Sequence, residues 1–387
     1  MKLALCLEYP IGLRGGVSVL VETLLEELVR RRHEVVLVSN DPPGSLEASD
    51  IGRRIQKHIF WDASNPTRAQ ARQLAGQLAD AGVELAHFHL GGNFGFGNRS
   101  PFRCPISAVH RRGIPCVTTA HLVVGLLDGY CGPRKPLWFK LLLLPMAWCG
   151  KMHQLLHVRA EITVSRHDHQ MQCRWYAPIR RRLVQIYHSR LRESDLAGPD
   201  IRREKVILNV GHLAPRKGQA VLAEAFAEIA GRYLDWRLEL AGKDLDGETT
   251  ARIRQLTQAH HLENRIVFLG ERTEVLSLMR RAAIYVQPSF EEALGLALQE
   301  AMACGCAVVG SRVGGIPELI ADEKLGLLVE AGNVSQLAAA LEKLMANAGQ
   351  REILGRAAAA FIRDSDMTIE AMVKRHLNLY KKILHPD

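Results

Sequence analysis

Short apolar segments alternate with longer segments of helical periodicity along the whole chain. Residues 3–7 form an apolar run that predicts a buried strand, and residues 17–31 carry apolar side chains at helical spacing. The same alternation restarts with a strand at residues 205–210. Strands separated by helices favour βαβ units, in which helices cover both faces of a parallel sheet. We therefore expect an α/β protein with two Rossmann-like, doubly wound domains that face each other across a cleft.

The length of 387 residues suits two domains better than one. A polar stretch at residues 189–204 is typical of a linker. We expect a first domain at 1–195 and a second at 196–365, with a final helix at 366–387 that packs back on the first domain. Ligands of open α/β sheets bind beyond the carboxyl ends of the strands, so the loops at those ends are the candidate site.

The net charge of +9 is concentrated in the first half of the chain. Residues 1–195 hold 26 Lys and Arg against 16 Asp and Glu, and residues 196–387 hold 24 against 25. Such asymmetry indicates an acidic partner, either nucleic acid or an anionic membrane surface, or else a merely solvated basic face. No nucleic-acid-binding module is recognisable, so we expect no nucleic-acid partner. Residues 134–148 combine cations, tryptophans and leucines, and predict either an interfacial amphipathic helix or a buried one.

Location and redox state follow from what the sequence contains. No stretch reaches the roughly 18 to 20 apolar residues that span a bilayer, and the first apolar run is too short for a secretory signal. The eight cysteines include no Cys-x-x-Cys pair, which favours reduced thiols. We expect a cytoplasmic protein, with peripheral contact at the inner face of the plasma membrane as an option.

Residues 288–318 carry the strongest chemical signal. Glu292 and Glu300 flank Ala293-Leu294-Gly295-Leu296, where the pattern predicts that a loop opens a helix. A helix N-terminus presents unpaired N–H groups and a positive dipole end, which suit a phosphate. A carboxylate on either side can accept hydrogen bonds from sugar hydroxyls. The segment therefore predicts a site for a nucleoside-diphosphate sugar; the alternative is an ordinary loop and helix with two solvated glutamates.

This segment resembles the donor site of the retaining glycosyltransferases of the GT-B fold, family 4. The family signature runs Pro-Ser-x-x-Glu-Gly-Phe-Gly-Leu, then Glu-Ala-Met-Ala-x-Gly, then Gly-Gly-x-Pro-Glu. In this chain Ala293 replaces the usual Gly and Leu294 the usual Phe. The resemblance implies that Glu292 acts in catalysis by holding the hydroxyls of the donor sugar, that Glu300 holds the ribose, and that the helix end at Leu296 holds the phosphates.

Residues 210–218 resemble the family's Gly-Arg-Leu-x-x-x-Lys-Gly. Two adjacent cations, Arg216 and Lys217, can neutralise a diphosphate, although a solvated pair is the alternative. By position Lys217 takes the role of the catalytic lysine, and His212 stands where the family has an arginine. Neutral imidazole donates one hydrogen bond and a guanidinium up to five, so we expect Arg216 to supply the missing charge.

Three other short stretches also resemble the family. Gly15 and Gly16 lie between the first strand and the first helix, like the Gly-Gly loop that closes over the diphosphate. His121 ends a strand, like the histidine that contacts the donor sugar near the reacting carbon; a structural histidine is the alternative. Gly270 lies in a stretch that resembles the loop around the nucleobase.

The resemblance implies an enzyme that moves a hexosyl group from a nucleoside-diphosphate sugar to an acceptor hydroxyl with retained configuration. We expect a glycan or lipid-linked acceptor, in cell-envelope polysaccharide or glycolipid synthesis. No tight set of His, Asp or Cys ligands is evident, so we expect no metal and no cofactor besides the donor. Two alternatives stay open, namely a sugar-nucleotide epimerase of the same fold and a non-catalytic nucleotide-sugar-binding protein.

Overall fold

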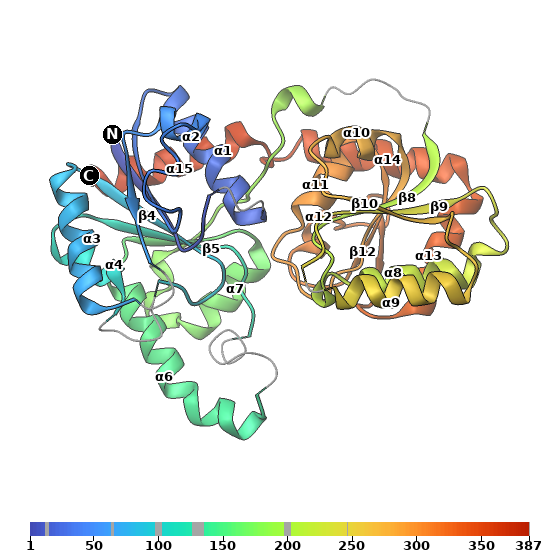
Figure 1. Cartoon of the computed structure of the whole chain (residues 1–387), viewed down its shortest axis with the longest axis horizontal. Coiled ribbons are helices and arrows are strands. Elements are labelled where there is room, and N and C mark those ends of the chain that lie inside the picture. The colour runs from blue at the N-terminus through green and yellow to red at the C-terminus, as the bar shows by residue number, and fades with distance from the viewer. Residues whose placement is uncertain are drawn as a thin grey trace. The chain divides into compact units, whose positions relative to one another are not determined.

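The computed structural model describes residues 1–11, 15–62, 66–96, 103–125, 135–196, 203–245 and 247–386. They form two compact units, one of Met1–His188 with Ile369–Asp387 and the other of Ser189–Thr368. Each unit contains one parallel sheet flanked by helices (Figure 1). The α/β class and the two Rossmann-like domains expected from the alternation are confirmed.

The sheet of the first unit has seven strands in the described residues, in the order β3-β2-β1-β4-β5-β6-β7. The strands are β1 (Lys2–Leu7), β2 (Glu34–Ser39), β3 (Lys57–Phe60), β4 (Leu85–Leu90), β5 (Cys116–Ala120), β6 (Ala160–Thr163) and β7 (Leu183–Gln185). The helices of this unit are α1 (Gly16–Arg30), α2 (Asp50–Arg54), α3 (Arg68–Asp80), α4 (Pro105–Arg111), α6 (Leu137–Leu156), α7 (Arg166–Trp175), η1 (Ala177–Arg182) and α15 (Ile369–Leu384). Strands β4 and β5 are buried along their whole lengths, as expected for parallel strands covered on both faces.

The sheet of the second unit has six strands in the described residues, in the order β10-β9-β8-β11-β12-β13. The strands are β8 (Glu204–Val210), β9 (Arg237–Ala241), β10 (Ile266–Gly270), β11 (Ala282–Gln287), β12 (Ala307–Ser311) and β13 (Leu327–Val329). The helices are η2 (Glu193–Leu196), η3 (Pro215–Lys217), α8 (Gln219–Ala230), α9 (Glu248–Ala259), α10 (Val275–Arg281), α11 (Leu296–Ala303), α12 (Ile316–Leu319), α13 (Val334–Ala346) and α14 (Ala348–Arg363). Helices α8, α9 and α13 cover one face and α10, α11 and α14 the other (Figure 1). The chain order reverses between β8 and β11, which is the point where doubly wound sheets bind ligands.

The borders of the two units differ slightly from the predicted ones. The first break falls between His188 and Ser189 rather than after 195, and the second falls between Thr368 and Ile369 rather than after 365. Residues 189–196 stay with the second unit because Arg190 contacts Glu300 and the carbonyl of Asp195 accepts from Arg280. Helix α15 belongs to the first unit and packs on α1.

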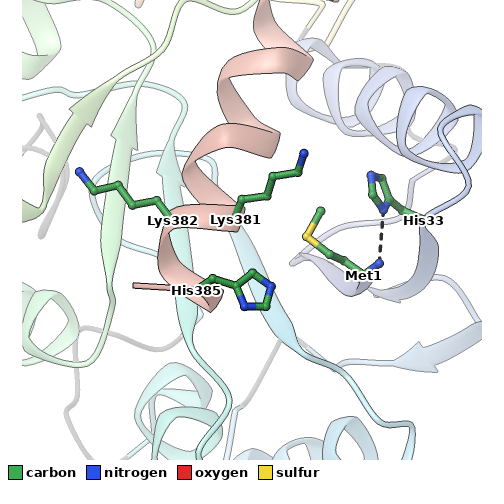
Figure 2. Close-up of a pocket in the computed structure, with 5 residues that line it drawn as sticks. All are labelled: Met1, His33, Lys381, Lys382 and His385. Atoms are coloured by element: carbon green, nitrogen blue, oxygen red, sulfur yellow. Dashed lines mark hydrogen bonds between the residues drawn. The ribbon is translucent and has the colours of Figure 1, made fainter. Parts of the chain in front are cut away.

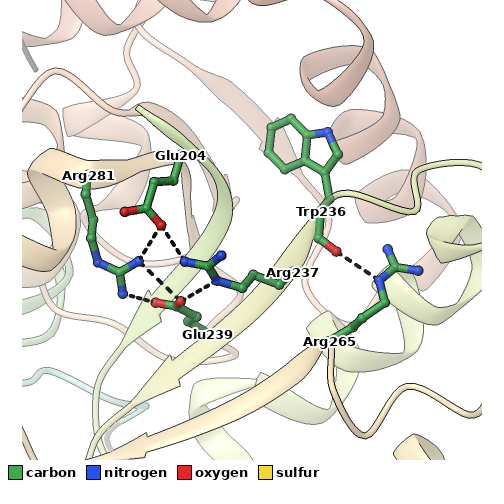
Figure 3. A network of polar contacts seen from close by, with 6 residues as sticks. All are labelled: Glu204, Trp236, Arg237, Glu239, Arg265 and Arg281. Atoms are coloured by element: carbon green, nitrogen blue, oxygen red, sulfur yellow. Dashed lines mark hydrogen bonds and ion pairs between the residues drawn. The ribbon is translucent and has the colours of Figure 1, made fainter. Parts of the chain in front are cut away.

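An ion-pair network joins the amino ends of β8 and β9 to the end of α10 (Figure 3). Glu239 is almost completely buried and pairs with Arg237 at 2.7 Å and with Arg281. Glu204 contacts the same two arginines. This network lies at the amino ends of the strands. It therefore stabilises the fold and takes no part in the loops at the carboxyl ends, where the candidate site is expected.

Among the described residues, none of the helices is both long enough and apolar enough to cross a membrane. Helix α6, with 20 residues, is the longest in the part of the chain that the structure describes, and it divides into two halves. Its second half buries Ala147, Lys151 and Leu155, whereas most of its first half is exposed. The sequence-based alternative of a wholly buried helix is therefore wrong for this segment.

Candidate functional site

The candidate site forms where three loops of the second unit meet at the carboxyl edge of its sheet. The loop after β8 is tied to the loop after β11 by the amide of Phe290, which donates to the carbonyl of Arg216 at 2.8 Å. The loop after β12 is tied to the same segment by the amide of Gly315, which donates to the carbonyl of Ala293 at 3.0 Å. These backbone bonds place the predicted residues of two motifs side by side.

Two glycines make this approach possible. Gly218 has φ +71°, and a Cβ there would lie 1.9 Å from the carbonyl oxygen of Pro288. Gly314 has φ +51°, and a Cβ there would lie 1.6 Å from the carbonyl oxygen of Glu292. Both positions combine a left-handed backbone with a contact that no side chain fits, so glycine is required by the fold itself.

Lys217 and Glu292 form an ion pair at the centre of these loops. The Nζ of Lys217 lies 2.6 Å from Oε2 of Glu292, and both side chains are about 15% exposed, at 16% and 14%. The same Oε2 accepts hydrogen bonds from Nε2 of Gln287 at 3.1 Å and from Oγ of Ser289 at 3.2 Å. Three donors on one oxygen fix the orientation of the carboxylate.

Glu300 lies on α11, close to the same end of β11. Burial raises the pKa of its carboxyl above the ordinary value, the guanidinium of Arg190 opposes this shift, and Asp195 adds to it. The Nη1 of Arg190 lies 3.4 Å from Oε1 of Glu300. Burial, followed by the charges of Glu300 and Glu292, raises the pKa of the Tyr285 hydroxyl. Both predicted carboxylates therefore lie close enough to the buried Tyr285 side chain to contribute to the raised pKa of its hydroxyl.

The N-terminus of α11 points its first amides at this edge. Gly295 is the N-cap with φ +93°, and no side chain of the described residues caps the helix there. Ala293 and Leu294 are buried, so the two departures from the family signature pack into the unit while their backbone forms the loop. Uncapped amides at a helix start carry partial positive charge, which suits an anionic group.

The other predicted donor-binding residues of the second unit lie around this centre. His212 and Arg216 belong to the loop of Lys217; the His212 carbonyl accepts from Nε2 of Gln219 at 2.9 Å, and Arg216 is exposed. Gly270 is the last residue of β10, which is two strands away from β8, and its carbonyl accepts from the amide of Gly242 at 2.8 Å.

The first unit holds Gly15, Gly16 and His121. Gly15 is the N-cap of α1, and a Cβ on Gly16 would meet no atom within 4 Å, so the fold does not demand glycine at residue 16. The residues before this pair, 12–14, lie outside the described part of the chain. His121 follows β5 and is buried, with Nε2 at 3.1 Å from Nδ1 of His89.

His121 is part of a buried histidine cluster in this unit. Its neighbouring rings are tilted against one another at centroid distances from 4.0 to 5.8 Å. The members are His87, His89, His121, His188 and His376. Burial is the main reason that the pKa of each lies below the ordinary value, and repulsion between the histidines lowers most of them further. Within the described ranges, no three metal-ligating side chains are placed to hold a metal ion.

Each of the two units matches a known protein family. Residues 14–189 match the family model described as Glycosyltransferase Family 4, and residues 193–361 match Glycosyl transferases group 1. The chain belongs to the family 4 glycosyltransferases. It is 31% identical over 184 residues to N-acetyl-alpha-D-glucosaminyl L-malate synthase of Bacillus anthracis, a match that covers 48% of this chain and 47% of that protein.

Other relatives of this chain agree with that assignment. D-inositol 3-phosphate glycosyltransferase of Pseudarthrobacter chlorophenolicus is 34% identical over 184 residues, covering 44% of each chain. The matched part thus spans about half the length of these relatives or less. A solved glycosyltransferase of Rickettsia africae has a TM-score of 0.78 at 20% identity over 100% of this chain and 99% of its own. The Anabaena protein HepE, solved with UDP, has a TM-score of 0.77 at 18% identity over 99% and 100%. These two likenesses support the GT-B fold.

Several residues of the candidate site were missed by sequence reasoning. Tyr285, Gln287 and Ser289 form a hydrogen-bonded chain, with 2.7 Å between the Tyr285 hydroxyl and Oε1 of Gln287 and 2.8 Å between Nε2 of Gln287 and Oγ of Ser289. Polar side chains at every second position share one face of a strand, and that spacing was the available signal. Arg190 had no such signal, because only the fold brings it to Glu300.

A cavity of about 580 Å³ in the first unit is lined by none of the residues of the candidate site (Figure 2). It is formed where β1 and β2 begin and α15 ends, and is lined by Met1, His33, Lys381, Lys382 and His385. That position is at the amino edge of the first unit's sheet. Since doubly wound sheets bind ligands at the carboxyl edge, this cavity is not the candidate active site.

Proposed function

We propose that this chain is a retaining glycosyltransferase that moves a hexosyl group from a nucleoside-diphosphate sugar to an acceptor hydroxyl. The observation that carries the proposal is the meeting of Lys217, Glu292 and the uncapped start of α11 at one end of β11. A cation and a helix N-terminus together match a diphosphate, and a carboxylate beside them matches sugar hydroxyls. Membership of the family supports the same reaction.

Each residue has a role in this proposal. Lys217 and the first amides of α11 hold the diphosphate and stabilise the charge that builds on it as the glycosidic bond breaks. Glu292 accepts hydrogen bonds from the donor sugar, and Glu300 accepts them from the ribose. The acceptor hydroxyl attacks from the face that the diphosphate leaves, and the leaving phosphate takes the hydroxyl proton. His121 contacts the donor sugar, and Gly270 lies by the nucleobase.

Lys217 has to change partners when the donor binds. In the structure its ammonium is paired with Glu292, and a phosphate would compete for that ammonium. Arg216 is exposed on the same loop and supplies a second cation where the family has an arginine at the position of His212. The reaction as proposed uses no metal, because these cations and the helix end take over the neutralisation of charge.

The setting of the reaction is also proposed. HepE was solved with UDP and with UDP-glucose, which makes a uridine donor the first to test. Unit 1 carries the basic excess of the chain, which favours a glycan or lipid-linked acceptor at an anionic surface in envelope synthesis. We place the protein in the cytoplasm, with peripheral contact at the inner membrane face.

Donor binding and turnover test the proposal separately. We expect UDP-, GDP- or ADP-sugars to raise the melting temperature of the protein, with one base clearly preferred. Lys217→Ala should lower kcat by about a hundredfold or more, because the charge on the leaving group is no longer neutralised. Lys205→Ala is the matched control, since Lys205 pairs with Asp235 at the amino end of β8.

The outcomes separate the alternatives. Equal turnover in Lys217→Ala and Lys205→Ala would overturn the assignment of Lys217. A changed sugar nucleotide formed without any acceptor would show an epimerase. Tight nucleotide binding without turnover on any acceptor would show a binding protein. The reason to consider this alternative is that His212 stands where the family has an arginine.

A further inference from the structure

Helix α6 exposes an unusual number of large apolar side chains in its first half. Trp138 and Leu142 are each 68% exposed, and Leu141 and Met146 are more than half exposed. Figure 1 shows α6 extending away from the sheet of its own unit. A contiguous apolar surface of this kind marks an interaction site.

The second half of α6 is fixed firmly to the unit. Lys151 and Glu161 are both completely buried, with Nζ at 2.7 Å from Oε2, and Gln154 and Thr118 donate to the same oxygen at 2.9 Å. At the end of the helix, Nη1 of Arg182 donates to the carbonyls of Leu155 and Leu156 at 2.9 and 2.8 Å. The second half of α6 is therefore bonded firmly to the first unit, and the exposed first half projects from it.

The distribution of the exposed side chains favours a lipid medium over a groove on a protein. At 100° per residue, Leu137, Trp138, Leu141, Leu142 and Met146 spread over about half of the helix circumference. A helix seated in a groove on a protein typically buries a stripe of about 100°, so this wider face suits the open medium of a lipid interface better. The ten residues from 137 to 146 measure about 15 Å, which is too short to span a bilayer and suits a position in its interface.

The charges beside this surface favour anionic lipid. Lys135 lies 5.8 Å from the ring centroid of Phe139, and Lys140 follows in the first turn of the helix. Residues 129–160 contain no Asp or Glu. Segment η1 packs at the other end of α6, where Arg182 bonds Leu155 and Leu156, and its exposed Arg180 and Arg181 add positive charge beside the anchored half. Tryptophans and lysines around an apolar helix are typical of interfacial anchors.

We propose that the first half of α6, residues 137–146, is a membrane-docking element that inserts into the interface of an anionic bilayer. This inference deepens the proposed function, because a lipid-linked acceptor would be reached only by an enzyme held at the membrane. The docking surface belongs to unit 1, and the candidate donor site belongs to unit 2. Vesicle binding and donor binding can therefore be measured independently.

Vesicle co-sedimentation of the full chain tests the inference. We expect binding to phosphatidylcholine vesicles with about one-third phosphatidylglycerol, and much weaker binding to phosphatidylcholine alone. The variant Trp138→Ser with Leu142→Ser should lower the affinity for the anionic vesicles by about tenfold or more. Lys135→Glu with Lys140→Glu should also weaken it and reduce its dependence on salt. Leu234→Ser is the matched control, since Leu234 is 78% exposed on unit 2.

Several outcomes would overturn the proposal. One is a wild-type chain that does not bind the anionic vesicles; another is an equal loss of binding in Leu234→Ser. A wild-type dimer that the Trp138 and Leu142 variant dissociates, without vesicle binding, would assign the surface to a second copy of the chain. Donor-induced melting shifts in the same variants show whether the fold and the donor site are intact, so failure of docking is distinguishable from failure of the proposed reaction.

Discussion

The position of the Glu292 carboxylate depends on Gly314, a glycine in the loop after β12. Gly314 lies against the Glu292 carbonyl with a left-handed backbone, and any Cβ there would meet that oxygen. We expect Gly314→Ala to lower the free energy of unfolding by about 1–3 kcal/mol, through backbone strain. Donor affinity should fall as well, because the displaced carbonyl moves Glu292 away from Lys217. Chemical unfolding and nucleotide titration measure the two effects.

Gly231→Ala is the control for this substitution. Gly231 has φ −62°, and a Cβ there would meet no atom within 4 Å. Alanine in an ordinary helical conformation should leave both stability and donor affinity close to those of the wild type. If Gly314→Ala behaved in the same way, the loop after β12 would not position Glu292.

At the level of residues, the sequence predicted the charged centre better than its surroundings. Lys217, Glu292 and Glu300 were found because each lies in a motif with fixed spacing, and the structure brings Lys217 and Glu292 within 2.6 Å. Gln287 lies outside these motifs, and Ser289 lies inside the signature without having been assigned a role; the hydrogen bonds of both to Glu292 depend on how β11 enters the loop. Arg190 was missed because its partner, Glu300, is remote in sequence.

At the level of elements, α6 shows how far a sequence pattern can mislead about burial. Lys140 and Lys151 look alike in the sequence, yet Lys140 is in the exposed half and Lys151 is completely buried. The difference comes from Glu161 on β6, which is a tertiary contact. Apolar periodicity predicted most of the strands and helices, but it could not separate the anchored half of α6 from the free half.

The anchor of α6 predicts a large loss of stability when its acid is removed. Glu161→Ala leaves the ammonium of Lys151 buried without a counter-charge, and we expect the free energy of unfolding to fall by about 3–5 kcal/mol. Adding Lys151→Met should recover part of this loss, because no charge then remains buried. Urea unfolding measures both. Asp235→Ala, which removes an exposed partner of Lys205, should leave the midpoint unchanged.

At the level of the whole molecule, alternation of strands and helices predicted both sheets, and the strand orders confirm the doubly wound arrangement. The histidine cluster could not be predicted in the same way. His87 and His89 lie on β4, His121 after β5 and His188 after β7, whereas His376 lies on α15 at the far end of the chain. Only the packing of α15 into the first unit brings the Tyr380 hydroxyl within 2.7 Å of His87 and adds His376 to the group.

This cluster makes the stability of the first unit dependent on pH. Burial keeps its histidines neutral in the folded state, with the pKa of His376 lowered to about 4. In the unfolded chain their pKa returns to about 6.5, so below that pH the unfolded state binds more protons than the folded one. The histidines therefore make their full contribution to the free energy of unfolding above about pH 6.5. As the pH falls toward 4, that free energy decreases by about 1.4 kcal/mol per pH unit for each histidine. His376→Leu should reduce the difference in unfolding free energy between about pH 7.5 and pH 5.5, whereas His260→Gln, at an exposed site, should not. If the difference in unfolding free energy between the two pH values were unchanged in His376→Leu, proton uptake by other groups would be the cause of unfolding in acid.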